Sequence, residues 1–197
     1  MLYNPNSELT PCMAKPLFGS VRYNSSIPAE ARFTQIFGDF CMPESVFYLV
    51  KCNSGTNEKS TPTLLTDDEA NFDIRPLPYG GEGFELVVDA GEQGLWILDF
   101  AAPLQAYFEE GVYANAERYP FNCLNVPGVE LITPEGGFLQ PKGEFEVLEF
   151  ATKSDKVERL SINFKLKNSN GECLEGAFRY KSKVPFDLEN PYTSDEE

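Results

Sequence analysis

The side chains in this sequence that could do chemistry are mostly carboxylates, because histidine is absent. The 197 residues include 31 Asp and Glu, 16 Lys and Arg and no His. The lack of His excludes a Ser-His-Asp triad, a Cys-His dyad, a His-ligated zinc ion and the usual proton carrier near neutral pH. The GxSxG, P-loop and GxGxxG motifs are also missing. The sequence therefore predicts no enzyme activity and no cofactor.

A pair of carboxylates could still hydrolyse a glycoside if two of them faced each other across a cleft. Asp99 and Glu149 could be named for this role, but nothing in the sequence distinguishes them from the other acidic residues. An enzyme of this kind is the least favoured of the functions considered below.

Two arginines are the strongest candidates for binding a ligand or partner. Arg118 lies in ANAERYPF and Arg179 in AFRYKS, each among aromatic residues. A guanidinium in such a place can hold a carboxylate or stack on a ring. The alternative for both is a structural pair with a carboxylate that ties strands together.

Aromatic and acidic residues add weaker candidates. Trp96, the only tryptophan, and Tyr119 could stack on a sugar or anchor a partner, or could simply be core side chains. Asp67, Asp68 and Glu69 offer oxygen ligands for calcium, but the spacing of an EF-hand loop is missing. A solvated loop is the alternative for these three, and no other metal site is predicted.

The cysteines do not form a recognisable metal motif, because none stands in a C-x-x-C pair. They are Cys12, Cys41, Cys52, Cys123 and Cys173. An odd number leaves at least one free thiol or one intermolecular bond, and several could be small buried hydrophobic residues. Cys41 and Cys52 flank SVFYLV, and at opposite ends of one strand they would be too far apart to bridge each other.

The charge limits the possible partners. A net charge of −15 argues against nucleic acid and anionic membranes, and suits high solubility, a cationic partner or calcium. A solvated acidic surface is the alternative. No apolar run is long enough for a transmembrane helix, and the N-terminus lacks a signal-peptide pattern. Three explanations stay open: the protein is cytosolic, it leaves by another route, or its leader has been removed.

Short strands must position these residues, because apolar residues alternate with polar ones at a period of two. The clearest case is 157–167, where Leu160, Ile162, Phe164 and Leu166 share one face. GEQG and SNG mark tight turns. The predicted strands are 46–50, 83–91, 94–100, 143–152, 157–167 and 174–182.

Helical signals are few and loops are frequent. A helix is predicted over 28–37, capped by Ser26, and a weaker one over 104–110, closed by Gly111. Residues 53–63 and 125–137 are predicted as linkers. The fold class is therefore all-β, an antiparallel sandwich or barrel with at most one or two short helices.

One strand occurs twice. Residues 17–28 and 174–185 share Leu, Gly, Arg, Tyr, Ser and Pro at identical offsets. Either the first copy closes a preceding, mostly lost module, or two equivalent strands lie in symmetric places of one sheet. Gly19 and Gly176 would mark a close backbone approach or a bulge. Arg179 should face away from Phe178 and Tyr180 because side chains alternate along a strand.

The residues that carry a family resemblance lie mainly in the C-terminal two thirds of the chain. They are LDFAAP, GVYANAERYPF, PGVEL, GEFEVLEF, SINFKL and LEGAFRY, in that order. This pattern, over about residues 72–182, resembles an uncharacterised all-β domain of bacterial secreted and surface proteins. PLFGSVRYNS (16–25) is similar to the last strand of that domain, which favours the lost-module interpretation.

The chain departs from that family in two places. TPEGGFLQPKG (133–143) stands where the family commonly has GRGCNTLTG, and NFKLKNSNGEC (163–173) replaces a DFEQHC segment. Any polar site formed there is lost in this chain. The resemblance implies a fold and brings no established activity. The expected organisation is a strand from a preceding module at 1–28, one β domain at 29–185 and an acidic tail at 186–197.

The sequence favours a non-enzymatic binding or interaction module with a protein partner. The alternative is an acidic inhibitor or immunity-like protein that neutralises a basic partner. A single acidic face would favour the inhibitor, whereas an even spread of acidic residues would favour the plain module.

Overall fold

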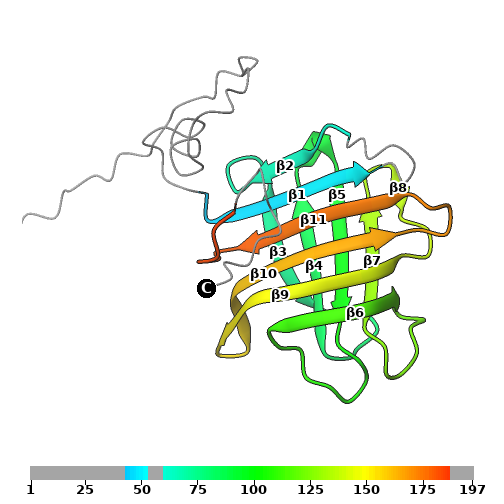
Figure 1. Ribbon diagram of the computed structural model, residues 1–197. Coiled ribbons are helices and arrows are strands. Elements are labelled where there is room, and N and C mark those ends of the chain that lie inside the picture. The colour runs from blue at the N-terminus through cyan, green and yellow to red at the C-terminus, as the bar shows by residue number, and fades with distance from the viewer. Residues whose placement is uncertain (1–42, 53–59, 187–197) are drawn as a thin grey trace, which may run out of the picture. The chain divides into compact units, whose positions relative to one another are not determined.

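The described part of the chain is built almost entirely of strands. The computed structural model describes residues 43–52 and 60–186 (Figure 1). These residues form a single 3-10 turn, η1 (Gly91–Gln93), and eleven strands. The strands are β1 (Ser45–Cys52), β2 (Thr63–Thr66), β3 (Asn71–Pro76), β4 (Gly83–Asp89), β5 (Leu95–Ala101), β6 (Gly111–Arg118), β7 (Gly128–Thr133), β8 (Gly136–Gly137), β9 (Lys142–Lys153), β10 (Lys156–Lys167) and β11 (Cys173–Tyr180). The predicted all-β class is confirmed.

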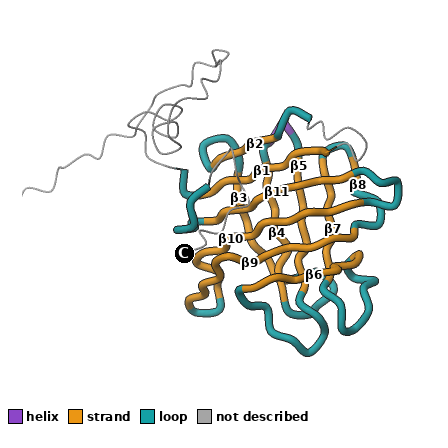
Figure 2. The backbone as a smooth tube through the Cα atoms, viewed as in Figure 1, coloured by secondary structure: helices purple, strands orange, loops and turns teal. Residues whose placement is uncertain are grey.

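The strands form one curled sheet with two halves. The strand order is β2-β1-β11-β10-β9-β6-β7-β5-β4-β3, and β8 pairs with β7. We call β2, β1, β11, β10, β9 and β6 sheet A, and β7, β5, β4, β3 and β8 sheet B. The strands of sheet A cross in front of those of sheet B, which is the orthogonal form of sheet packing (Figure 2). We call the side of each sheet that faces away from the shared core its outer face.

Strand β6 joins the two halves. Its first residues pair with β9 in antiparallel fashion, and its last two, Glu117 and Arg118, pair with β7 in parallel. The other strand pairs of the described residues are antiparallel. The sheet is therefore mixed, although antiparallel pairing dominates as predicted.

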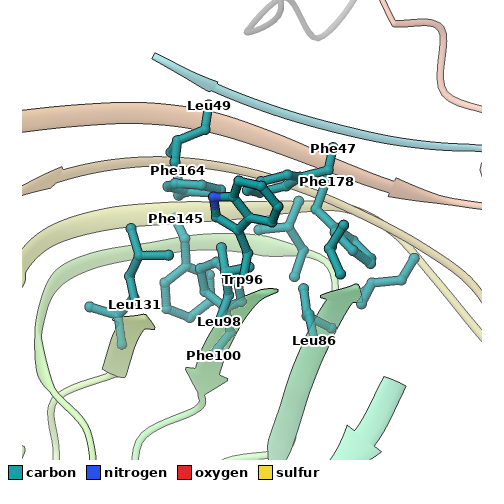
Figure 3. Packing of buried hydrophobic residues seen from close by; sticks show 14 of the residues in the cluster. Phe47, Leu49, Leu86, Trp96, Leu98, Phe100, Leu131, Phe145, Phe164 and Phe178 are labelled. Atoms are coloured by element: carbon teal, nitrogen blue, oxygen red, sulfur yellow. The ribbon is translucent and has the colours of Figure 1, made fainter. Parts of the chain in front are cut away.

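The core lies between the inner faces of the two sheets and is rich in phenylalanine. The rings of Phe100 from sheet B and Phe145 from sheet A lie 4.9 Å apart, and Trp96 lies 5.9 Å from Phe47 (Figure 3). Fully burying one such side chain stabilises the folded state by roughly 1.5–3 kcal/mol. Leu160, Ile162, Phe164 and Leu166 are all buried here, which confirms the predicted alternation of β10.

Most of the predicted strands are present. The 83–91 and 94–100 segments form the β4–β5 hairpin, and the C-terminal meander corresponds to β9, β10 and β11. A side chain at Gly176 would meet the Phe164 ring at 2.1 Å, so this glycine makes room for a side chain and not for the close backbone approach or bulge that was predicted. Arg179 and Phe178 lie on opposite faces of β11, also as predicted.

Two local predictions are wrong. The helix over 104–110 is a loop, because Gln105 has a positive φ of 71° and only one turn-type bond forms, from Ala106 N to Pro103 O. The 125–137 segment is not a linker. It contains β7, which lies between β5 and β6, and its flanking Pro and Gly residues hid the apolar alternation of VELIT.

Several predictions fall outside the described residues. They are the helix over 28–37, the first strand copy with Gly19, Cys12 and Cys41, and most of the 53–63 segment. The described residues all belong to one compact unit. Within that unit, no helix is long and apolar enough to cross a membrane.

Candidate functional site

A row of charged residues crosses the outer face of sheet B. Antiparallel pairing places Arg75 of β3 opposite Glu85 of β4, then Asp99 of β5, then Glu130 of β7. We call these four residues the charged row. Their neighbours in sequence, such as Leu98 and Val129, point into the core, so alternation sends these polar side chains outward.

Asp99 is the unusual member of the charged row because it is buried and charged groups of the same sign flank it. Only 7% of the residue is exposed, and among the described residues no partner bonds its Oδ1. Burial, followed by the charges of Glu85 and Glu130, raises the pKa of Asp99 to about 7. This carboxyl group therefore changes its charge near neutral pH.

Three apolar side chains cover the end of the outer face beside Asp99. Leu77, Ala101 and Tyr119 form a small buried cluster, and the Tyr119 ring lies over Gly128 of β7. A methyl group at Gly128 would come within 3.1 Å of Tyr119, so the glycine leaves room for the ring. This cluster removes water from one side of the charged row.

The two ends of the charged row carry arginines. Arg118 Nε donates to Glu130 Oε2 at 2.9 Å, and its guanidinium lies 5.3 Å from the centre of the Phe121 ring. Burial raises the pKa of Glu130, and Arg118 opposes that rise. Arg75 donates to Asp73 at 2.7 Å and lies 3.9 Å from Glu85. The outer carboxylates thus have cationic neighbours, while Asp99 in the middle has none of these bonds.

Tyr119 ties the charged row to a neighbouring loop. Its hydroxyl donates to the Gly80 carbonyl oxygen at 2.9 Å and accepts from the Tyr79 N–H at 3.2 Å. Burial raises the pKa of this hydroxyl above its ordinary value. The ring is 6% exposed, so Tyr119 acts as an internal support and not as an open platform.

Three loops meet at one end of the molecule, which we call the loop end. They are residues 77–82, 102–110 and 119–127, and the latter two extend below the strands in Figure 1. Ala102 N donates to Glu82 O at 2.8 Å, and Leu104 N donates to Leu124 O at 2.7 Å. The backbone therefore links the three loops to one another.

The loop end exposes large apolar side chains. Tyr107 is 80% exposed, Phe121 76% and Tyr79 75%, and Leu124 and Leu104 are also exposed. A shallow hollow adjoins them, with Arg118 and Phe121 on one side and Lys142 on the other. Scattered exposed apolar residues are ordinary, but five of them on three linked loops form a group that could contact a partner.

The structure gives Arg179 a structural position. It lies on the outer face of sheet A, is 3% exposed and donates to the carbonyl oxygens of Ile162 and Phe178 and to Asn163 Oδ1, at 2.8–3.1 Å. Burial lowers its pKa to about 10, so it stays positive at neutral pH. These contacts match the structural alternative in that Arg179 ties β10 to β11.

The other predicted site residues are dispersed. Trp96 is buried in the core, which matches its structural alternative. Asp67, Asp68 and Glu69 are exposed in the turn between β2 and β3, and they do not come together as a metal-ligand set. Arg118 is the predicted candidate that lies at the surface, beside the loop end.

Asp99 and Glu149 cannot act as a catalytic pair. Asp99 lies on the outer face of sheet B, whereas Glu149 pairs in register with Ser161 on sheet A. Burial raises the pKa of Glu149, but hydrogen bonds from Arg159, Lys183 and Ser182 outweigh this and lower it. The core separates the two carboxylates, so they do not share a cleft.

Sequence reasoning missed the special position of Asp99. The signal was an acid inside the apolar segment GLWILDF, but its neighbours come from β4 and β7. Comparisons with family models, curated proteins and solved structures found no match. The family resemblance therefore stays a prediction, and function must be argued from the geometry of this chain.

Proposed function

We propose that this protein is a non-enzymatic binding module that contacts a protein partner through its loop end. The observation that carries the proposal is the group of five exposed apolar side chains on three loops that bond to one another. The centre of an interface is typically built from aromatic anchors of this kind.

The hydrogen bonds that order the three loops favour binding to a partner. The bonds from Ala102 to Glu82, from Leu104 to Leu124 and from Tyr119 to Gly80 hold the three loops to one another. Loops that are already ordered lose less conformational entropy when a partner binds. Aromatic side chains add large contact areas at a low entropic cost.

The charges near the loop end suggest the chemistry of the partner. The three loops contain the acidic residues Glu82, Glu109 and Glu110, and they contain no Lys or Arg. The whole chain has a net charge of −15. We therefore infer a partner surface with an apolar centre and basic residues around it.

The test compares two variants in a pull-down from the native source, quantified by mass spectrometry. One variant carries Tyr79→Ser, Tyr107→Ser and Phe121→Ser, and the matched control carries Leu95→Ser and Ile132→Thr, which change exposed apolar residues of sheet B away from the three loops. We expect the recovery of specific partners to fall about tenfold or more with the loop variant and to be unchanged with the control. Equal recovery with both variants would contradict the proposal.

An acidic inhibitor of a basic protein is the second candidate function. Its support is the excess of carboxylates and the absence of basic residues from the three loops. It requires an affinity that falls steeply with salt, because charge would dominate binding. A Glu82→Lys and Glu109→Lys variant should then lose more affinity than the aromatic variant. The reverse order favours the plain binding module.

We also infer that the chain is a divergent member of the uncharacterised bacterial all-β domains described above. The support is the ordered set of motifs from LDFAAP to LEGAFRY. A structure of one such domain would test this inference. It should have the strand order of sheets A and B, with the two motif arginines at the positions of Arg118 and Arg179.

A further inference from the structure

Two cysteines and a glutamate meet on the outer face of sheet A. Cys52 ends β1 and lies directly opposite Cys173, which begins β11. Glu175 is two residues along β11, so its side chain lies on the same face. Their two sulfur atoms and one carboxylate oxygen all lie within 4.8 Å of one another, and all three residues are half-buried.

We propose that Cys52, Cys173 and Glu175 bind a thiophilic divalent cation of the zinc type. Two thiolates and a carboxylate are a ligand set that such an ion accepts, and water would fill a fourth, tetrahedral position. A zinc–sulfur bond is about 2.3 Å, so the two sulfurs on one tetrahedral ion lie roughly 3.8 Å apart. The upper limit of 4.8 Å on the separation of the ligand atoms is compatible with this arrangement.

The local sheet supports this ligand set. Eight residue pairs join β1 to β11 in unbroken register, so the backbone holds Cys52 beside Cys173 before any ion arrives. A site on rigid strands keeps its geometry better than one on loops. Within the part of the chain that the structure describes, no other group of three Cys, Asp or Glu ligand atoms is this close together.

The charges around the cluster also suit a bound cation. Two thiolates and one carboxylate carry three negative charges, and a divalent ion leaves one of them. On the neighbouring strand β10, Lys167 lies opposite Cys173 and Lys165 lies opposite Glu175, where they can balance that remaining charge. The sequence gives no sign of this site, because the two cysteines are 173 − 52 = 121 positions apart.

The same two cysteines could instead form a disulfide across the strands, which is the main competing outcome. The structure records no such bond. The geometry favours the cation because a third donor, Glu175, lies within reach of both sulfurs.

The test is a titration of the full chain with Co²⁺, after reduction and removal of metal under anaerobic conditions. Cobalt replaces zinc and gives a thiolate-to-metal charge-transfer band. We expect the wild type to bind a single ion with this band and to release it to Zn²⁺. Cys52→Ser and Cys173→Ser should each lower the affinity by more than the ~10–100-fold expected for an outer-shell partner. Glu175→Gln should weaken binding but keep the band.

Cys123→Ser is the matched control because Cys123 is exposed in the 119–127 loop. It should bind Co²⁺ like the wild type, and circular dichroism should show that every variant is folded. The proposal is overturned if no charge-transfer band forms, or if the band survives both Cys52→Ser and Cys173→Ser. It is also overturned if alkylation and mass spectrometry find a Cys52–Cys173 disulfide in the purified protein. None of these outcomes bears on the loop end.

Discussion

The outer faces of the two sheets each bury one charged side chain, and the two differ in how their polar atoms are satisfied. Arg179 on sheet A donates three hydrogen bonds within 3.1 Å, to two carbonyl oxygens and the Asn163 side chain. Asp99 on sheet B is similarly buried but has carboxylates on both sides. Burial alone therefore does not identify a functional residue. The number and sign of the groups around it decide whether its charge is stabilised.

The surroundings of the two residues extend this contrast. Around Arg179, the outer face of sheet A carries a second apolar cluster that includes Val46, Tyr48 and Phe186. Beside Asp99, the outer face of sheet B leads through Tyr119 to the loop end, where large side chains are exposed. Arg179 and its acceptors are thus part of the fold, whereas the charged row of sheet B adjoins the surface that we propose for binding.

The largest effect is expected from removing Arg179. Arg179→Met should lower the free energy of unfolding by about 3 kcal/mol, since it leaves buried acceptors without a donor. Arg118→Met should cost less than about 1 kcal/mol, because its ion pair is partly exposed. Urea denaturation of both variants measures the difference. Equal losses would break the contrast between the two arginines.

Asp99→Asn should stabilise the protein at alkaline pH. The pKa of Asp99 is about 7 in the folded state and about 3.9 when unfolded, so the folded state binds more protons between these values. Stability contributed by the neutral acid is therefore lost as the pH rises through this window. The gain of the variant over the wild type should therefore grow by about 2.5 kcal/mol from pH 5 to pH 8, at about 1.4 kcal/mol for each unit between pH 5 and the folded-state pKa.

Urea denaturation from pH 5 to pH 8 measures this effect, with Asp73→Asn as the control. Asp73 is an exposed neighbour on β3, and its variant should stay within about 0.5 kcal/mol of the wild type. A gain from Asp99→Asn that grows as the pH falls would contradict the charge placed on this residue.

A smaller effect is expected at the end of the charged row. Arg118→Gln should raise the pKa of Glu130 further, because it removes the cation that opposes the effect of burial. It should cost about 0.5–1 kcal/mol of stability at neutral pH. Carboxyl NMR titration would follow Glu130 directly. An unchanged pKa would mean that Arg118 does not stabilise the Glu130 carboxylate.

The smallest effect on stability is expected at the loop end. Tyr107→Ser should change the free energy of unfolding by no more than about 0.5 kcal/mol, because the ring is exposed. Tyr119→Phe should cost more, since it removes the hydrogen bonds to Gly80 and Tyr79. Thermal unfolding of the two variants measures the difference in stability. A larger loss for Tyr119→Phe would show that Tyr119 supports the loop, whereas Tyr107 is free to contact a partner.

The strands that the sequence predicted best are those with one face buried. In β10, every second residue from Leu160 to Leu166 is apolar, and this alternation correctly predicted which side chains are buried. Strand β7 was missed because Pro127, Pro134 and nearby glycines are typical of a linker. Local composition therefore predicts elements well when no turn residue interrupts them.

The site was harder to predict because it depends on register. The raised pKa of Asp99 comes first from burial and then from Glu85 and Glu130, and these residues meet only when β4, β5 and β7 pair. The same holds for Cys52 and Cys173. Sequence reasoning named Arg118 and Tyr119 but could not tell that one is at the surface and the other supports a loop.

Photo-crosslinking at the loop end tests the central claim most directly. A photoreactive phenylalanine analogue would replace Tyr107 in one sample and Leu95, exposed elsewhere on sheet B, in another. After irradiation in an extract of the native source, we predict a discrete crosslinked partner for position 107 and none for position 95. A crosslink from position 95 alone, or none from position 107, would contradict the account.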